Sequence, residues 1–112
     1  MRTVSFKDGV AFTVPTAWQI VTLELLLKHW PYEQGELVIT SACDGQHSDD
    51  SYHYEGKAFD IRTRHLKELE APAVHRKLQL ELGIYYDVIL EKTHIHIEPS
   101  PSSPFARVRK PY

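Results

Sequence analysis

The sequence predicts a single α+β domain, in which a small antiparallel sheet packs with two to three helices. Short runs rich in β-branched residues alternate with two longer segments whose apolar residues recur at helical spacing. The chain has 112 residues, 42% of them hydrophobic, which fits one compact domain able to bury a core. We expect residues 1–99 to form this domain and residues 100–112, which are rich in proline and close with basic residues, to form an extended arm.

The N-terminal part is expected to form a β-hairpin followed by a helix. An Asp-Gly pair lies between two apolar runs and tolerates the positive φ values of a tight turn, so residues 4–14 are predicted to be the hairpin. Residues 16–30 carry an apolar stripe, with Thr16 as the N-cap. Pro31 disfavours helical geometry in the residue before it, so the predicted helix ends there.

The rest of the chain is predicted to contain four strands and a second helix. The helix runs from 73 to 82, because apolar residues recur at helical spacing up to Leu82 and Gly83 is a natural terminator. His75, within this helix, is expected to be a surface residue. The strands are predicted over residues 36–43, 57–62, 85–90 and 94–98.

Charge and composition argue against several classes of partner. The formal net charge is −2 with both signs interspersed and no basic stripe, so we expect a small or peptidic substrate and no nucleic acid. Cys43 is the only cysteine and can form no internal disulfide. No apolar run reaches the length of a signal peptide or a membrane span. We therefore expect a soluble monomer that is made in the cytoplasm and does not insert into membranes.

Histidines and carboxylates concentrate in two stretches, Ser41 to Arg64 and Glu91 to Glu98. In the first stretch, His53 and Asp60 are seven positions apart, which neither a regular strand nor a helix would bring onto one ion. Gly56 lies between them and relieves the backbone at a bend. A bend at this glycine would let both side chains reach one metal ion.

In the second stretch, His94 and His96 occupy alternate positions of the predicted strand and therefore share one face. Zinc accepts mixed imidazole and carboxylate ligands, and a catalytic site uses three protein ligands and leaves the fourth position for water. That number is supplied by His53, Asp60 and one of the two strand histidines. Glu91 is then the nearest candidate to take a proton from the attacking water.

These two stretches resemble a known family. Ser51 to Asp60 resembles the S-x-H-x-x-G-x-A-x-D signature of the M15 group of zinc peptidases, and residues 86–98, YDVILEKTHIHIE, resemble the strand that supplies its third ligand. The group includes D-Ala-D-Ala carboxypeptidases and dipeptidases, bacteriophage endolysins and, as structural relatives, the amino-terminal domains of hedgehog proteins. The resemblance covers roughly residues 16–99 and implies one zinc ion in a cleft on the sheet.

The resemblance also implies a role for each site residue. It makes His53, Asp60 and His96 the zinc ligands. It makes Glu91 the general base and His94 a cleft residue that stabilises the developing oxyanion. Some members of the group place the acidic residue three positions before the ligand, and that pattern would instead make His94 the ligand that accompanies Glu91.

Two further residues are candidates for binding substrate. Arg62 lies two positions after Asp60, on the same face of a regular strand, and could bind a substrate carboxylate bidentately. It could equally be a solvated charge at the end of the strand. Ser51 is a candidate either for contacting substrate or for ordering the loop through hydrogen bonds to the ligands.

The function implied by the resemblance is that of a zinc metallopeptidase acting on the bacterial cell wall. It would hydrolyse stem or cross-link peptides of peptidoglycan, as a D,D-carboxypeptidase or an L,D-endopeptidase of the kind that phage endolysins supply. The alternative is a non-catalytic zinc-binding interaction module, which the resemblance to hedgehog domains allows.

Overall fold

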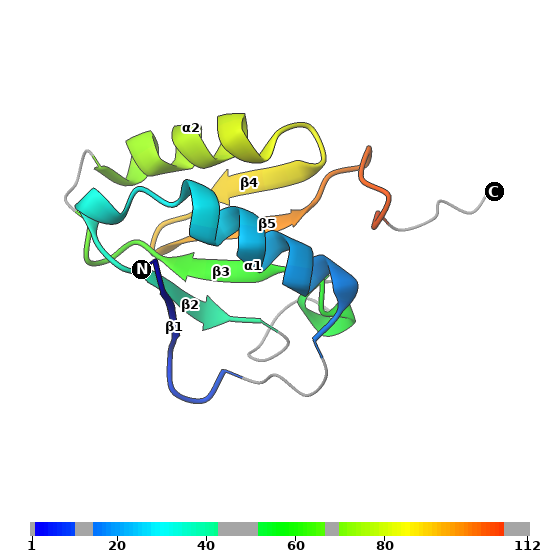
Figure 1. The fold of residues 1–112 in the computed structure, drawn as a ribbon, viewed down its shortest axis with the longest axis horizontal. Coiled ribbons are helices and arrows are strands. Elements are labelled where there is room, and N and C mark those ends of the chain that lie inside the picture. Colours follow the sequence, from blue (N-terminus) through cyan, green and yellow to red (C-terminus); the bar gives the residue numbers. More distant parts are fainter. Residues whose placement is uncertain (1, 11–14, 43–51, 67–69, 107–112) are drawn as a thin grey trace.

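A computed structural model of the chain describes residues 2–10, 15–42, 52–66 and 70–106. Among these residues, five strands form one sheet and two α-helices pack on one of its faces, so the predicted α+β single domain is confirmed (Figure 1). The strands are β1 (Val4–Phe6), β2 (Leu37–Ser41), β3 (Phe59–Arg62), β4 (Tyr86–Leu90) and β5 (His94–Pro99). The helices are α1 (Ala17–His29) and α2 (Glu70–Leu82), with short 3-10 helices η1 (Tyr32–Gln34) and η2 (Tyr52–Glu55).

The strand order in the sheet is β1-β2-β3-β5-β4. All pairs from β2 to β4 are antiparallel, as predicted. The sheet is nevertheless mixed, because β1 pairs in parallel with β2, with Val4 opposite Leu37. The predicted turn forms at residues 8 and 9, where Gly9 has a φ of 89°. Of the second arm of the predicted hairpin, residues 10–14, Val10 belongs to no strand and residues 11–14 lie outside the described residues.

α1 begins and ends where the sequence indicates. The side chain of Thr16 accepts a hydrogen bond from the backbone of Gln19 at 3.1 Å, and Gln19 Oε1 accepts one from the backbone of Thr16 at 2.9 Å. The Thr16 hydroxyl also donates to the carbonyl of Gly56 at 2.6 Å, which ties the start of α1 to the segment before β3. Trp30 is extended, as expected of a residue that precedes a proline.

α2 begins at Glu70, before the predicted residue 73. Pro72 therefore lies in the first turn, where its missing N–H leaves no intrahelical hydrogen bond unmade. Gly83, with a φ of 82°, follows the last helical residue. The face that α2 turns towards the core carries Val74, Leu78 and Leu82.

The prediction that His75 is a surface residue was wrong. This side chain is half-buried, and its Nε2 donates to the carbonyl of Val88 in β4 at 2.7 Å. Gln79, one turn further along α2, donates to the carbonyl of Tyr86 at 2.9 Å and accepts from the backbone N–H of Val88 at 3.1 Å. Two polar side chains of α2 thus satisfy backbone groups of β4, the last strand in the sheet order.

The core lies between the two helices and the sheet. Phe59 of β3 is fully buried, with its ring centroid 5.4 Å from that of Trp18 in α1. Because side chains alternate along a strand, the neighbours of these core residues point to the opposite face. The core positions of β3 and β5 are Phe59, Ile61, Ile95 and Ile97. The residues that alternate with them, on what we call the outer face of the sheet, are Asp60, Arg62, His94, His96 and Glu98.

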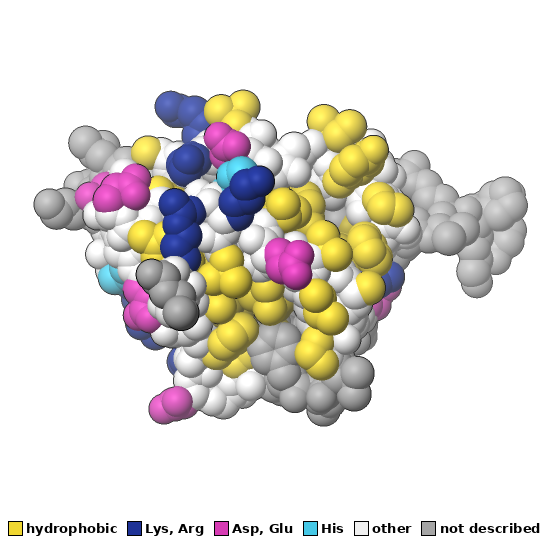
Figure 2. Space-filling view, in the orientation of Figure 1, with side chains coloured by type: hydrophobic (Ala, Val, Ile, Leu, Met, Phe, Trp, Pro, Cys, Tyr) yellow, Lys and Arg dark blue, Asp and Glu magenta, His cyan; other side chains and the backbone are white. Residues whose placement is uncertain are grey.

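The helical side of the molecule carries exposed apolar side chains. Figure 2 shows hydrophobic side chains gathered over this side, next to a group of Lys and Arg side chains. Exposed large apolar residues of α1, α2 and the turn after α2 include Ile20, Val21, Leu80, Ile84 and Tyr85. Within the described part of the chain, neither helix combines the length and apolar content needed to cross a membrane.

Candidate metal centre

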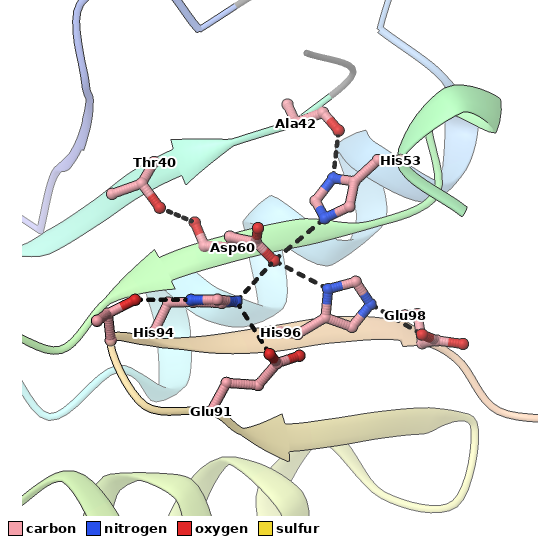
Figure 3. Close-up of polar contacts among 9 residues, drawn as sticks. Thr40, Ala42, His53, Asp60, Glu91, His94, His96 and Glu98 are labelled. Carbon is pink, nitrogen blue, oxygen red and sulfur yellow. Dashed lines mark hydrogen bonds and ion pairs between the residues drawn. The ribbon is translucent and has the colours of Figure 1, made fainter. Parts of the chain in front are cut away.

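Asp60 lies at the centre of a cluster of histidines on the outer face (Figure 3). Its Oδ1 atom is 3.1 Å from Nε2 of His53 and 2.9 Å from Nδ1 of His96. The three candidate ligand atoms all lie within 4.8 Å of one another. His53 and Asp60 are buried and His96 is partly buried. These three side chains could therefore hold one metal ion.

The register between β3 and β5 places Asp60 beside His96. The two residues are 36 positions apart in the sequence and lie directly opposite each other in the sheet. On either side of this pair, Phe59 faces Ile97 and Ile61 faces Ile95 in the core. A slip of one residue would turn His96 into the core and an isoleucine outwards, so the burial of these apolar residues fixes the site.

A bend brings His53 to the same place, as the sequence predicted. His53 belongs to η2, which ends at Glu55, and the next residue, Gly56, has a φ of 66° in the left-handed region. The backbone N–H of Gly56 donates to the carbonyl of His53 at 3.1 Å, and that of Lys57 donates to the carbonyl of Tyr52 at 2.9 Å. The chain therefore reverses before β3, and residues 53 and 60 can approach one another.

The orientation of the His53 ring is set by β2. Its Nδ1 donates to the carbonyl of Ala42, just after β2, at 2.5 Å. A neutral imidazole with a proton on Nδ1 has a lone pair on Nε2, and here that nitrogen faces the carboxylate of Asp60. A lone pair and a carboxylate oxygen 3.1 Å apart repel unless a proton or a cation lies between them. This donor set therefore fits a metal ion.

The charges of the cluster show how strongly it favours a cation. Burial alone would raise the pKa of Asp60, but its contacts with His53 and His96 and the charges nearby hold it well below its usual range. Burial alone would lower the pKa of His96, but hydrogen bonds to Asp60 and Glu98, with their charges, raise it to about 9. In the metal-free protein, a proton on His96 thus takes the place of the cation.

Glu91 and His94 lie beside the cluster. Nε2 of His94 is 3.7 Å from Oε2 of Glu91 and 3.8 Å from Oδ1 of Asp60. The backbone N–H of Glu91 donates to the carbonyl of His94 at 2.9 Å, which holds the two residues together at the turn between β4 and β5. Glu91 has a side chain that is 48% exposed, so solvent or a substrate can reach its carboxylate.

Of the two candidates for binding substrate, the structure describes Arg62 but not Ser51. Arg62 is half-buried on β3 and lies opposite His94 in β5. Its place on the outer face, two residues from Asp60, agrees with the predicted strand geometry. Ser51 lies outside the described residues, and so does Cys43.

Glu98 is a site residue that the sequence reasoning missed. Its Oε1 accepts a hydrogen bond from Nε2 of His96 at 2.8 Å. The signal was present, because Glu98 follows His96 at the alternate position of the same strand and so shares its face. The contact of His53 with the carbonyl of Ala42 gave no such signal, since every residue carries a backbone carbonyl.

The chain matches a known protein family. The family description of the Hedgehog amino-terminal signalling domain matches residues 8–98. The chain belongs to this family. The matched region contains His53, Asp60, Glu91, His94 and His96. A search among curated proteins finds no match to the chain.

Membership of the hedgehog family confirms one part of the resemblance. Hedgehog amino-terminal domains are the structural relatives that the motif implied beside the zinc peptidases, and the observed α+β fold agrees. The hedgehog-like domain of this chain carries a His-Asp-His group that could hold a metal ion. The identity of the ion and the chemistry at the site are matters of proposal.

Proposed function

We propose that this hedgehog-like domain is a zinc-dependent peptidase that hydrolyses stem or cross-link peptides of peptidoglycan. The observation that supports this most is the placing of Glu91. Its carboxylate is exposed and is 3.7 Å from His94, beside the group of His53, Asp60 and His96 but outside it. A purely structural zinc site has four protein ligands and needs no free carboxylate next to it.

In the proposal, Nε2 of His53, Oδ1 of Asp60 and Nδ1 of His96 hold the ion. Bound zinc would polarise the scissile carbonyl and lower the pKa of a water molecule. His94 is the less favoured third ligand, because its Nε2 is 3.8 Å from Asp60 Oδ1 whereas Nδ1 of His96 is 2.9 Å away.

Glu91 and His94 carry out the proton and charge chemistry. Glu91, which solvent reaches, accepts the proton of the attacking water and passes it to the leaving amine. His94 lies between Glu91 and Asp60, and its Nε2–H can donate a hydrogen bond to the oxygen on which negative charge develops. The hydrogen bond between the Thr93 hydroxyl and His94 Nδ1, at 3.2 Å, helps to orient the ring.

Arg62 supports a substrate with a free carboxyl terminus. It lies on the outer face, opposite His94 in the neighbouring strand. Its guanidinium can bind a carboxylate through two hydrogen bonds. Arginine at this position favours the carboxypeptidase form of the proposal, since an endopeptidase has no terminal carboxylate next to the bond that it cuts.

The experiment that tests the proposal measures metal content and hydrolysis together. Purified protein should bind one zinc ion and release new amino groups from purified peptidoglycan. Glu91→Gln should keep the zinc and the fold but lower the rate by about 10²- to 10⁴-fold, because the amide cannot accept the proton. Zinc-loaded wild-type protein that cleaves no peptidoglycan peptide would end the enzymatic proposal.

The second candidate function is a non-catalytic zinc-binding interaction module. It is favoured by the family itself, which is described as a signalling domain. The Glu91→Gln variant separates the two candidates, because a binding module would keep its biological effect when the carboxylate becomes an amide. The enzyme would lose it.

A further inference from the structure

Glu98 and Asp60 contact opposite sides of the His96 ring. Nδ1 of His96 is 2.9 Å from Oδ1 of Asp60, and Nε2 is 2.8 Å from Oε1 of Glu98 (Figure 3). The side chains of His96 and Glu98 are 13% and 26% exposed. The ring is therefore held between two carboxylates in a partly desolvated setting, where hydrogen bonds to charged groups are strong.

Because of the chemistry of imidazole, the contact of Nε2 with Glu98 determines whether Nδ1, which faces Asp60, carries a lone pair. A neutral imidazole has one N–H donor and one lone pair, and an ionised carboxylate can only accept. When Glu98 accepts from Nε2, the proton must stay on that nitrogen. In the neutral ring, which His96 must become to bind a metal ion, the lone pair is then on Nδ1, which points towards Asp60 and His53.

His53 is held in the same way, but the roles of its two ring nitrogens are exchanged. Its Nδ1 donates to the carbonyl of Ala42, so the lone pair is on Nε2. The two histidines thus present different nitrogens to one place, and each is fixed by an acceptor on the far side of its ring. For His53 the acceptor is a backbone group, and for His96 it is the side chain of Glu98.

We propose that Glu98 is a positioning residue of the metal centre, which selects the His96 tautomer whose Nδ1 binds the ion. This inference rests on the proposed zinc site. The carboxylate also makes Nδ1 a stronger donor to the metal, as outer carboxylates do for ligating histidines. Glu98 shares the outer face of β5 with His94 and His96, because the three residues occupy alternate positions of this strand.

The first test compares zinc affinity among three variants, by competition with a chromogenic chelator. Glu98→Ala removes the acceptor and should weaken zinc binding about 10- to 100-fold. Glu98→Gln keeps an acceptor oxygen without the charge, so it should bind more tightly than Glu98→Ala and more weakly than the wild type. Glu81→Ala is the matched control, because Glu81 carries an exposed carboxylate on α2 whose contact is with His29, away from the cluster. Its affinity should equal that of the wild type.

The second test identifies the nitrogen that binds zinc, from ¹⁵N chemical shifts of the imidazoles in zinc-loaded protein. The wild type should show His96 bound through Nδ1 with a proton on Nε2, and His53 bound through Nε2. Glu98→Ala should show a second population of His96 with the nitrogens exchanged. The same spectra report whether each variant is folded, and the isosteric Glu98→Gln keeps the comparison possible if Glu98→Ala unfolds.

The outcomes separate this inference from the proposed function. His96 bound through Nε2 in the wild type, or equal zinc affinity in all variants, would overturn the role of Glu98 and leave the peptidase proposal standing. Coordination through Nδ1 that depends on Glu98, in a protein that cleaves no peptide, would support the role of Glu98 and refute the peptidase. A wild-type protein that binds no zinc would overturn both.

Discussion

At the scale of single residues, Asp60 is the side chain on which the site depends. One of its oxygens, Oδ1, lies within 4 Å of a ring nitrogen from each of His53, His94 and His96. In the metal-free protein, the His96 ring bridges this oxygen and Glu98. The arrangement stabilises the fold only while Asp60 is ionised and His96 is protonated, so metal-free stability depends on pH.

We expect the metal-free protein to lose stability as the pH rises through about 9. The raised pKa of His96 means that its contribution is complete below the ordinary value of 6.5 and disappears as the pH passes about 9. The lowered pKa of Asp60 acts at the other end, with a contribution that is present above the ordinary 3.8 and is lost as the pH falls further. Urea unfolding of chelator-treated protein should show an alkaline decrease of a few kcal/mol in the free energy of unfolding.

His96→Gln is the control for this pH dependence. It removes the titrating ring, so the alkaline decrease should largely vanish. If the variant and the wild type lose the same free energy of unfolding between neutral pH and about pH 10, groups other than His96 cause the loss and the prediction fails.

A second prediction at this scale concerns Arg62. If its guanidinium binds the terminal carboxylate of the substrate, Arg62→Gln should lower kcat/KM for peptides with a free carboxyl terminus by about 10- to 100-fold, the value of a charge-assisted hydrogen bond. Peptides with an amidated terminus should be cut slowly by both proteins and should not distinguish them. An equal loss for both kinds of peptide would show that Arg62 only supports the strand.

At the scale of elements, α2 does more than cover the core. Gln79 contacts the backbone of Tyr86 and of Val88, and His75 contacts the carbonyl of Val88. These contacts satisfy N–H and C=O groups of β4, which among the described residues has a neighbouring strand on one side only. Backbone groups on the open side of a strand invite pairing with another chain, and α2 occupies them with side chains.

We expect Gln79→Ala to destabilise the protein by about 1–3 kcal/mol, because a partly buried N–H and a partly buried carbonyl lose their partner. Denaturant unfolding at neutral pH measures this. The control is Leu80→Ala at the next position of α2, whose side chain is 76% exposed. It should change the free energy of unfolding by less than about 0.5 kcal/mol. Equal effects of the two substitutions would show that helix propensity, and not the cover of β4, is responsible.

The elements were largely predictable from the sequence, and the reasons are local. The apolar spacing and the Thr16 cap predict α1, and the alternation of His94 and His96 with isoleucines predicts β5 and its outer face. The parallel pairing of β1 with β2 was not predictable, because it joins strands separated by all of α1 and no local pattern encodes it. The early start of α2 was missed because Pro72 is compatible either with the first turn of a helix or with a kink, and the local sequence does not separate the two.

For the site, the residues were predictable from the sequence but the orientations of the histidine rings were not. His53, Asp60, Glu91, His94 and His96 could be named from residue types and spacing, and the structure brings them together. The nitrogen that each histidine turns inwards could not be predicted. That choice depends on Ala42 and Glu98, which contact the rings only after β2, β3 and β5 have assembled.

At the scale of the whole molecule, the two faces of the sheet have different roles. One face packs against α1 and α2 and contains the apolar core, and the other presents ionisable groups from β3 and β5 (Figures 1 and 3). Asp60 and His96 come from segments 36 residues apart, and their approach requires the sheet. The complete candidate site therefore exists in the folded protein only, and an ion bound there would stabilise the fold.

We expect zinc to raise the midpoint of thermal unfolding of chelator-treated protein. At free zinc about 100 times the dissociation constant, linkage gives about 2.7 kcal/mol, or about 10 °C for a domain of this size. Magnesium should give no shift, because two imidazoles and one carboxylate are poor ligands for it. His96→Ala should abolish the zinc shift, whereas His94→Ala, two residues away on the same face, should keep most of it. The reverse result would make His94 the third ligand, and the site would then pair Glu91 with a ligand three positions after it.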